Sequence, residues 1–254
     1  MEGGGESGPY KLLKAYKEQI LLIGSINVHI GNKARRNELV GLLSWIGIDL
    51  CVVSETWFRE DSGERLMNES LENSEYGWSG RDRQKQKTWT GDGGVGIVVK
   101  KGIGEVSVAK VSKEYDMLWL RIKMNEEILY VAAVYCCCEG SKRMSDTRAQ
   151  FLELEADIFE FQKQGKVICL GDFNARIGVG ESFYWRGEEK VVIPRMSEDH
   201  QVEGIDRDRG QQFLDIMNAR DMIILNGVDN KGEFTFIEII SPINKRIKAD
   251  VTRG

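Results

Sequence analysis

The sequence has few of the residues that build zinc cages or disulfide frameworks. It contains two histidines and five cysteines among 254 residues, with no C-x-x-C pair. Three of the cysteines are adjacent at 136–138, so their side chains cannot all point the same way, and only His29 and His200 could join them. This pattern argues against a zinc site. All five cysteines lie in or beside apolar runs, which indicates buried thiols in a reducing intracellular compartment; the sequence does not decide between nucleus and cytoplasm.

Long hydrophobic runs and an excess of positive charge are also missing. No apolar run is long enough to cross a membrane, and the N-terminus has no signal-peptide pattern, so we expect a soluble protein without a membrane partner. The net charge is −5, from 35 basic and 40 acidic residues, which excludes a globally basic nucleic-acid binder. Any contact with DNA would need a local basic patch working with a divalent cation.

One short segment could supply such a patch. Residues 81–87, followed by Trp89, combine basic side chains with an aromatic ring. The side chains that would contact a nucleic-acid backbone are Arg81, Arg83, Lys85 and Lys87. A solvated surface loop explains the same residues at least as well, so both interpretations stay open.

The length and the 41% hydrophobic content indicate one domain with a full core. We expect a flexible N-terminal tail over residues 1–18 and the domain over residues 19–254. The hydrophobic pattern predicts strands at 20–27, 49–54, 94–100, 117–123, 128–135, 166–171 and 222–225, with two short strands after them. It predicts helices over 145–164, near 211–220, and before Gly47 with Leu39, Leu42, Leu43 and Ile46 on one stripe. The three middle strands, 94–100, 117–123 and 128–135, are expected to pair as neighbours.

The most informative stretch is Gly171-Asp172-Phe173-Asn174-Ala175, which directly follows an apolar run. In an extended segment Asp172 and Asn174 project to one side, while Phe173 turns into the core. A carboxylate and an amide that share one small space suit attack of water on a phosphodiester, because the carboxylate can take a proton and the amide N–H can hold a phosphoryl oxygen. The same pair can instead form a turn through hydrogen bonds from side chain to backbone.

Polar residues also end other predicted strands. Asn27 closes the first, Glu55 follows the second in Ser54-Glu55-Thr56, and Tyr135 closes a middle strand. Each has a plain structural explanation, as a turn former, a loop acid and an interface aromatic respectively. The recurrence of the pattern at several strand ends favours a shared site.

These segments, in this order, resemble the endonuclease/exonuclease/phosphatase superfamily. The resemblance rests on Asn27, Ser54-Glu55-Thr56, Gly93-Gly94-Val95-Gly96-Ile97, Val131 to Tyr135 and Gly171-Asp172-Phe173-Asn174-Ala175. It runs from about residue 20 to the C-terminus, and it is closest to endonuclease domains of LINE-type retrotransposons and to craniofacial-development-protein-2-like proteins. The resemblance implies a DNase I-like fold: a four-layered α/β sandwich of two packed, mainly antiparallel or mixed sheets flanked by helices.

The resemblance also implies metal-dependent hydrolysis of phosphodiesters, with DNA as the substrate and Mg²⁺ or Mn²⁺ as the cofactor. Glu55 would hold the metal, and Asn27 would assist at the metal and the phosphate. Asp172 would orient or deprotonate the attacking water, Asn174 would bind a phosphoryl oxygen, and Tyr135 would contact the phosphate. The residue chemistry agrees, because Mg²⁺ is usually held by one or two carboxylates together with waters and substrate oxygens.

The C-terminal end departs from the family pattern. Residues 245–251 correspond to a family strand, in which Asp250 matches the acid that supports the catalytic histidine. The family's final Ser-Asp-His segment should follow and is absent, and neither His29 nor His200 matches it by motif. We therefore expect an incomplete domain that lacks the last strand segment.

Three hypotheses stay open on this basis. They are a DNA endonuclease of retrotransposon origin, an inactive truncated remnant that binds metal or nucleic acid, and an enzyme that acts on a phosphoinositide or another small phosphoester. If the loop at 76–92 contacts a DNA duplex, salt should weaken binding steeply, whereas a small-molecule site should respond less. The sequence gives no oligomeric state and does not show whether a reverse transcriptase domain follows in a longer gene product.

Overall fold

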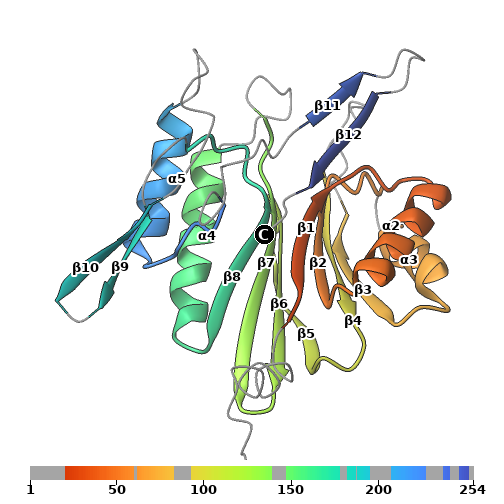
Figure 1. Cartoon of the computed structure of the whole chain (residues 1–254), viewed down its shortest axis with the longest axis horizontal. Coiled ribbons are helices and arrows are strands. Elements are labelled where there is room, and N and C mark those ends of the chain that lie inside the picture. The colour runs from red at the N-terminus through yellow and green to blue at the C-terminus, as the bar shows by residue number, and fades with distance from the viewer. Residues whose placement is uncertain are drawn as a thin grey trace, which may run out of the picture.

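Two β-sheets pack face to face in the computed structural model of the protein, and helices cover their outer faces (Figure 1). The structure describes residues 21–59, 62–82, 93–138, 147–177, 182–186, 188–194, 207–226, 237–240 and 246–251. The order of the layers is helix, sheet, sheet, helix (Figure 1). The four-layered α/β sandwich expected from the sequence is therefore confirmed.

The first sheet has the strand order β11-β12-β1-β2-β4-β3, in which β1 and β2 are parallel and the other neighbours antiparallel. Its strands are β1 Ile23–Asn27, β2 Leu50–Ser54, β3 Tyr76–Arg81, β4 Val95–Lys100, β11 Ile237–Ile240 and β12 Arg246–Val251. Its outer face is covered by α2 Lys33–Ile46 and α3 Gly63–Leu71 (Figure 1). Because both faces of β2 are covered, the strand is buried throughout: Val52 packs toward the second sheet and Val53 under the helices.

The second sheet has the strand order β5-β6-β7-β8, in which β7 and β8 are parallel. Its strands are β5 Glu105–Val111, β6 Asp116–Met124, β7 Glu127–Tyr135 and β8 Lys166–Asp172. Its outer face carries α4 Thr147–Gln162 and α5 Arg207–Ala219, beside the hairpin β9 Ser182–Arg186 and β10 Glu189–Ile193 (Figure 1). Side chains alternate as a strand requires: Leu118 and Leu120 face the first sheet, and Trp119 faces the helices.

The helix before Gly47 is present, but its apolar stripe is narrower than predicted. Gly47 ends α2 with φ 77°, and its N–H donates to the carbonyl of Leu43 at 2.9 Å. Leu39 and Leu43 are buried, whereas Leu42 and Ile46 are 39% and 45% exposed.

In the described part of the chain, no helix has the length and apolar character needed to cross a membrane.

Two predictions about the strands are wrong. The run at 94–100 forms β4, but β4 pairs with β2 and β3 in the first sheet and not with β6 and β7. Residues 222–225 form no strand, because the N–H of Met222 donates to the carbonyl of Met217 at 2.8 Å and so closes the end of α5. The structure adds one helix and four strands that the hydrophobic pattern does not predict, namely α3, β3, β5, β9 and β10.

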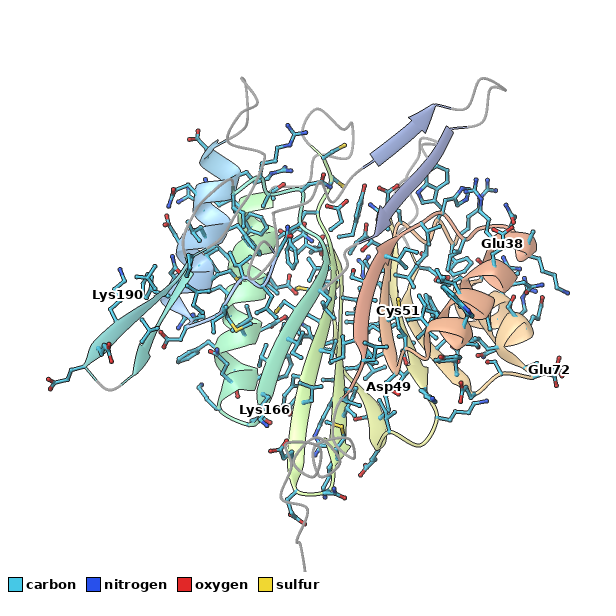
Figure 2. All side chains as sticks on the ribbon, in the orientation of Figure 1. Glu38, Asp49, Cys51, Glu72, Lys166 and Lys190 are labelled. Atoms are coloured by element: carbon cyan, nitrogen blue, oxygen red, sulfur yellow. The ribbon has the colours of Figure 1, made fainter. Side chains whose placement is uncertain are left out.

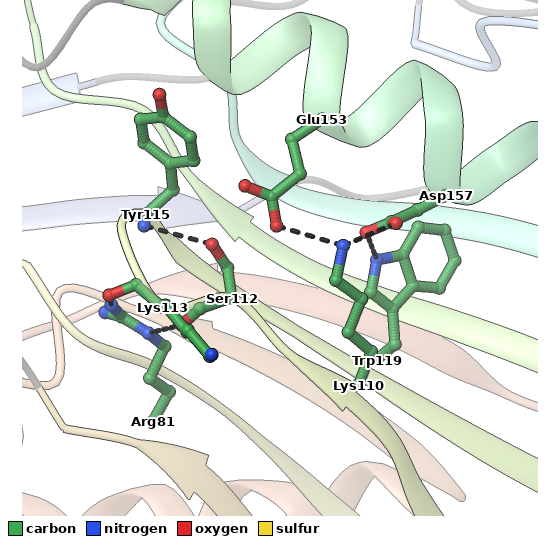
Figure 3. Close-up of polar contacts among 8 residues, drawn as sticks. All are labelled: Arg81, Lys110, Ser112, Lys113, Tyr115, Trp119, Glu153 and Asp157. Carbon is green, nitrogen blue, oxygen red and sulfur yellow. Dashed lines mark hydrogen bonds and ion pairs between the residues drawn. The ribbon is translucent and has the colours of Figure 1, made fainter.

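Ion pairs fix α4 against the outer face of the second sheet. Lys110 Nζ on β5 lies 2.6 Å from Asp157 Oδ1 and 3.0 Å from Glu153 Oε1, both on α4 (Figure 3). The indole N–H of Trp119 donates to the other oxygen of Asp157 at 2.9 Å. Burial raises the pKa of Asp157, and the hydrogen bond from Lys110 opposes that shift. These contacts join α4 to β5 and β6.

The parallel strands place four chain segments at one edge of the sandwich. Asp49, just before β2, and Lys166, at the start of β8, lie at the same edge (Figure 2). Because β1 runs parallel to β2 and β7 runs parallel to β8, the carboxyl ends of all four strands gather at the opposite edge. Polar residues that end these strands are therefore brought together there.

Candidate active site

Side chains from both sheets meet where β1, β2, β7 and β8 end. The amide Nδ2 of Asn27 donates to Glu55 Oε1 at 3.1 Å and to Asp172 Oδ2 at 2.8 Å. Asn27 lies beside Ser54 in the β1–β2 pair, and Tyr135 lies beside Asp172 in the β7–β8 pair. The structure thus brings together residues that the sequence singled out from four separate segments.

Asp172 and Asn174 form a turn and share one space. The backbone N–H of Asn174 donates to Asp172 Oδ1 at 3.0 Å, and Asn174 has a φ of 46°. The side-chain Nδ2 of Asn174 donates to the carbonyl of Cys136 at 2.6 Å. Phe173 points into the core, with its ring centroid 4.6 Å from that of Phe213. One oxygen of Asp172 is therefore bound within its own turn, and the other is bound by Asn27.

The surroundings of the site raise the pKa of two of its titratable groups. Burial raises the pKa of Asp172, although the hydrogen bonds from Asn174 and Asn27 oppose the shift. Burial also raises the pKa of Tyr135, and the nearby carboxylates of Glu55 and Asp172 add to this effect. The phenol therefore stays protonated and can donate a hydrogen bond to an anionic oxygen, while a carboxylate of raised pKa is a stronger base.

Gly171 allows β7 and β8 to approach closely just before the turn. Its φ is 130°, in the region that favours glycine. A Cβ at this position would collide with the carbonyl oxygen of Val134 on β7. The glycine therefore sets the position from which Asp172 projects.

We expect Gly171→Ala to lower the free energy of unfolding by about 1–3 kcal/mol or more, because it adds both backbone strain and overpacking. Urea denaturation measures the loss as a shift in the transition midpoint. Gly102→Ala is the matched control, because Gly102 also has a positive φ, of 91°, but a Cβ there would meet nothing within 4 Å. Equal losses in the two variants would mean that the contact with Val134 has no effect.

Backbone and side-chain hydrogen bonds hold the segment that carries Glu55. The backbone N–H groups of Thr56 and Trp57 donate to the carbonyls of Gly94 and Gly93 at 3.2 and 3.0 Å. The indole Nε1 of Trp57 donates to Glu55 Oε2 at 3.2 Å. Sequence reasoning gave Trp57 no role, although its place two residues after Glu55 was visible.

Arg209 is a second residue that sequence reasoning missed. It is 9% exposed and comes from α5. Its guanidinium donates to the carbonyl oxygens of Cys137 and Asn174 at 2.8 and 3.4 Å, and to Thr147 Oγ1 at 2.7 Å. Arg209 therefore ties the loops after β7 and β8 to the start of α4, directly behind the site.

The donor set of the site fits a hard divalent cation. It offers the carboxylates of Glu55 and Asp172 beside the side-chain amide of Asn27, and carboxylate and amide oxygens are ligand types that Mg²⁺ prefers. Across the described ranges, no group of three or more His, Cys, Asp or Glu side chains is placed to hold a metal. Mg²⁺ usually keeps several waters and substrate oxygens in its shell, so one or two carboxylates are enough to hold it.

Arg81 does not lie at the surface as a contact to nucleic acid would. It is 7% exposed, and its Nη1 lies 2.6 Å from Asp116 Oδ1. It also donates to the carbonyls of Ser112 and Lys113 at 2.8 and 3.2 Å (Figure 3). The prediction for Arg81 is corrected: its charge is used inside the protein to join β3 to the start of β6.

The remaining predicted residues are only partly described. Arg83, Lys85 and Lys87 lie outside the described residues, so their role stays a prediction. The backbone of Asp250 pairs with Asn27 in the β1–β12 ladder, which places this residue next to the site. Its side chain is outside the described part, and its proposed support of a histidine stays a prediction.

Comparison with known proteins agrees with this fold. The sequence model of the Endonuclease/Exonuclease/phosphatase family matches residues 24–232. The endonuclease domain of TRAS1, a telomere-specific non-LTR retrotransposon, is 15% identical, with a TM-score of 0.50 over 89% of this chain and 81% of that one. An AP endonuclease from Archaeoglobus fulgidus is 15% identical, with a TM-score of 0.51 over 91% of this chain and 87% of that one. The AP endonuclease LMAP from Leishmania major is 13% identical, with a TM-score of 0.53 over 78% and 66%. No curated protein matched the sequence.

Proposed function

The chain belongs to the endonuclease/exonuclease/phosphatase family, and from this premise we propose that it hydrolyses DNA phosphodiesters with the help of Mg²⁺ or Mn²⁺. The observation that carries the proposal is the pair of hydrogen bonds from Asn27 Nδ2 to Glu55 and Asp172, of which the second joins residues 145 positions apart. The bridge holds two carboxylates side by side where the strands end, one available to a cation and one available as a base. A base for water and a cation beside the phosphate are what hydrolysis of a phosphodiester needs.

The chemistry divides among the side chains of the site. Asp172 takes the proton of the attacking water, and burial makes its carboxylate more basic for this step. Asn174 Nδ2 has a second N–H besides the one donated to Cys136, and this N–H donates to a phosphoryl oxygen. The protonated hydroxyl of Tyr135 donates to the phosphate as well. A cation held by Glu55 and Asn27 would add positive charge beside the phosphate and the leaving oxygen.

A retrotransposon endonuclease is the biological role that we propose for this activity. The motifs closest to that class are Ser54-Glu55-Thr56 and the segment from Gly171 to Ala175. The TRAS1 domain comes from an element of that kind, and its fold is shared over most of both chains. The net charge of −5 fits an enzyme that contacts DNA through a local surface together with a cation.

Nicking of supercoiled plasmid tests the proposal. We expect conversion to open circles in Mg²⁺ or Mn²⁺, and none in EDTA or with Glu55→Gln, because both remove the cation from the site. The rate should fall steeply as salt rises from about 50 to 200 mM, because duplex DNA binding releases counterions. A folded protein that binds Mn²⁺ but leaves the plasmid intact would contradict the proposal. If the protein cleaved only a small phosphoester, its substrate would be that class of molecule and not DNA.

A further inference from the structure

We propose that Trp57 is a positioning residue that holds the carboxylate of Glu55 in the orientation needed for the divalent cation. The inference rests on the proposed function and deepens it, because it assigns a task to a residue that does not itself reach the phosphate. It depends on three observations: the hydrogen bond of the indole, the backbone of the segment, and the ring that lies against the indole.

Each oxygen of Glu55 accepts a hydrogen bond from a different side chain. Oε1 accepts from Asn27 Nδ2 at 3.1 Å, and Oε2 accepts from Trp57 Nε1 at 3.2 Å. Two donors on two oxygens fix the rotation of the carboxylate about its last bond, which a single donor would leave free. Each oxygen keeps a lone pair for a cation, since a carboxylate offers about four acceptor sites.

The backbone is kept in an unfavourable conformation to place this indole. Trp57 has a φ of 57° and Glu55 a φ of 56°, in the left-handed region that bulky residues avoid. The hydrogen bonds from Thr56 and Trp57 to Gly94 and Gly93 hold the segment there. Such a conformation persists where the surroundings enforce it. Here the enforced backbone places the indole N–H of Trp57 on the carboxylate of Glu55.

His29 fixes the plane of the indole. Its ring centroid lies 3.8 Å from that of Trp57, with 33° between the planes. His29 comes from the loop after β1, two residues beyond Asn27. The loops after β1 and β2 therefore meet through these two rings, and the donors to the two oxygens of Glu55 come from the end of β1 and from the loop after β2.

The consequence is a specific effect on metal affinity. Removing a hydrogen bond from a metal ligand typically weakens metal binding on the order of 10–100-fold, while the ligand itself remains. Trp57→Phe removes the indole N–H and keeps an aromatic ring against His29. We therefore expect weaker binding of the cation without a change of fold.

Titration with Mn²⁺, followed by electron paramagnetic resonance, measures this effect on the whole chain. Trp78→Phe is the matched control, because the indole N–H of Trp78 is buried without a hydrogen-bond partner in the described part of the chain. We expect Mn²⁺ to bind Trp57→Phe about 10–100-fold more weakly than the wild type, and Trp78→Phe to match the wild type. Plasmid nicking by Trp57→Phe should recover as Mg²⁺ is raised, because affinity is lost and not the chemical step.

Two results would overturn the inference, and they separate it from the proposed function. Equal Mn²⁺ affinity in the wild type and Trp57→Phe, with binding lost in Glu55→Gln, would leave the metal site in place and remove the role of Trp57. No Mn²⁺ binding by the wild type would refute the metal site and the role of Trp57 together. Thermal melting without metal checks that each variant is folded.

Discussion

Asp172→Asn is expected to lower the rate of plasmid nicking by about 10²–10⁴-fold, the range that a general base contributes. The amide cannot take a proton from water at neutral pH. It is nevertheless close in shape to the carboxylate, and its oxygen can still accept the hydrogen bonds from Asn27 or from the backbone of Asn174. The loss should therefore appear in the chemical step, while the fold remains.

Single-turnover nicking at saturating Mg²⁺ isolates that step from binding. Asp221→Asn is the matched control, because Asp221 is exposed and has a φ of 51°, a conformation that asparagine adopts readily. We expect this control to retain the activity of the wild type. If Asp172→Asn cleaved at the rate of the control, Asp172 would not be the base, and its role would be to accept the hydrogen bonds from Asn174 and Asn27.

The site was predictable because its residues share one structural reason for being together. Asn27, Glu55 and Asp172 each end or follow a strand that pairs in parallel with a neighbour, so one edge of the sandwich collects them. Hydrophobic runs identify such strands, and the polar residue after each run marks its end. The chemistry of the edge could be inferred without knowing the loops.

The order of strands could not be obtained in the same way. The run that forms β4 is apolar on both faces, which indicates burial but does not identify its partners. Sequential strands often pair, and that tendency gave the wrong sheet for β4. Residues 222–225 are apolar as well, yet the helix before them ends by using the N–H of Met222. The partner strands decided the outcome for β4, and the end of the preceding helix decided it for residues 222–225.

Residues whose hydrogen-bond partners are backbone carbonyls are the hardest to recognise from a sequence. Arg209 donates to the carbonyl of Cys137, 72 positions away, and any residue type presents the same carbonyl. Arg81 lay in a run of basic residues that suggested a solvated or DNA-binding loop, but its partner Asp116 is 35 positions away. The composition of a segment reports only on its sequence neighbours. The roles of Arg81 and Arg209 depend on partners that are distant in sequence and that the fold places beside them.

Asp116→Ala is expected to lower the free energy of unfolding by about 3–5 kcal/mol, because it leaves the charge of Arg81 buried without its carboxylate. The side chains of the pair are 6% and 4% exposed, so water cannot replace the lost partner. The carbonyls of Ser112 and Lys113 remain, but they bear no full charge. Chemical denaturation of the metal-free protein measures the loss.

The exposed pair of Arg65 and Glu69 provides the matched control for that measurement. Its side chains are 66% and 47% exposed and lie one helical turn apart, so Glu69→Ala should cost about 0–1 kcal/mol. Replacing both buried partners, as Arg81→Met with Asp116→Leu, should recover much of the loss, because the buried ion pair is then removed as a whole. Similar losses for Asp116→Ala and Glu69→Ala would mean that Arg81 reaches solvent, and its role as a contact to DNA would then have to be reconsidered.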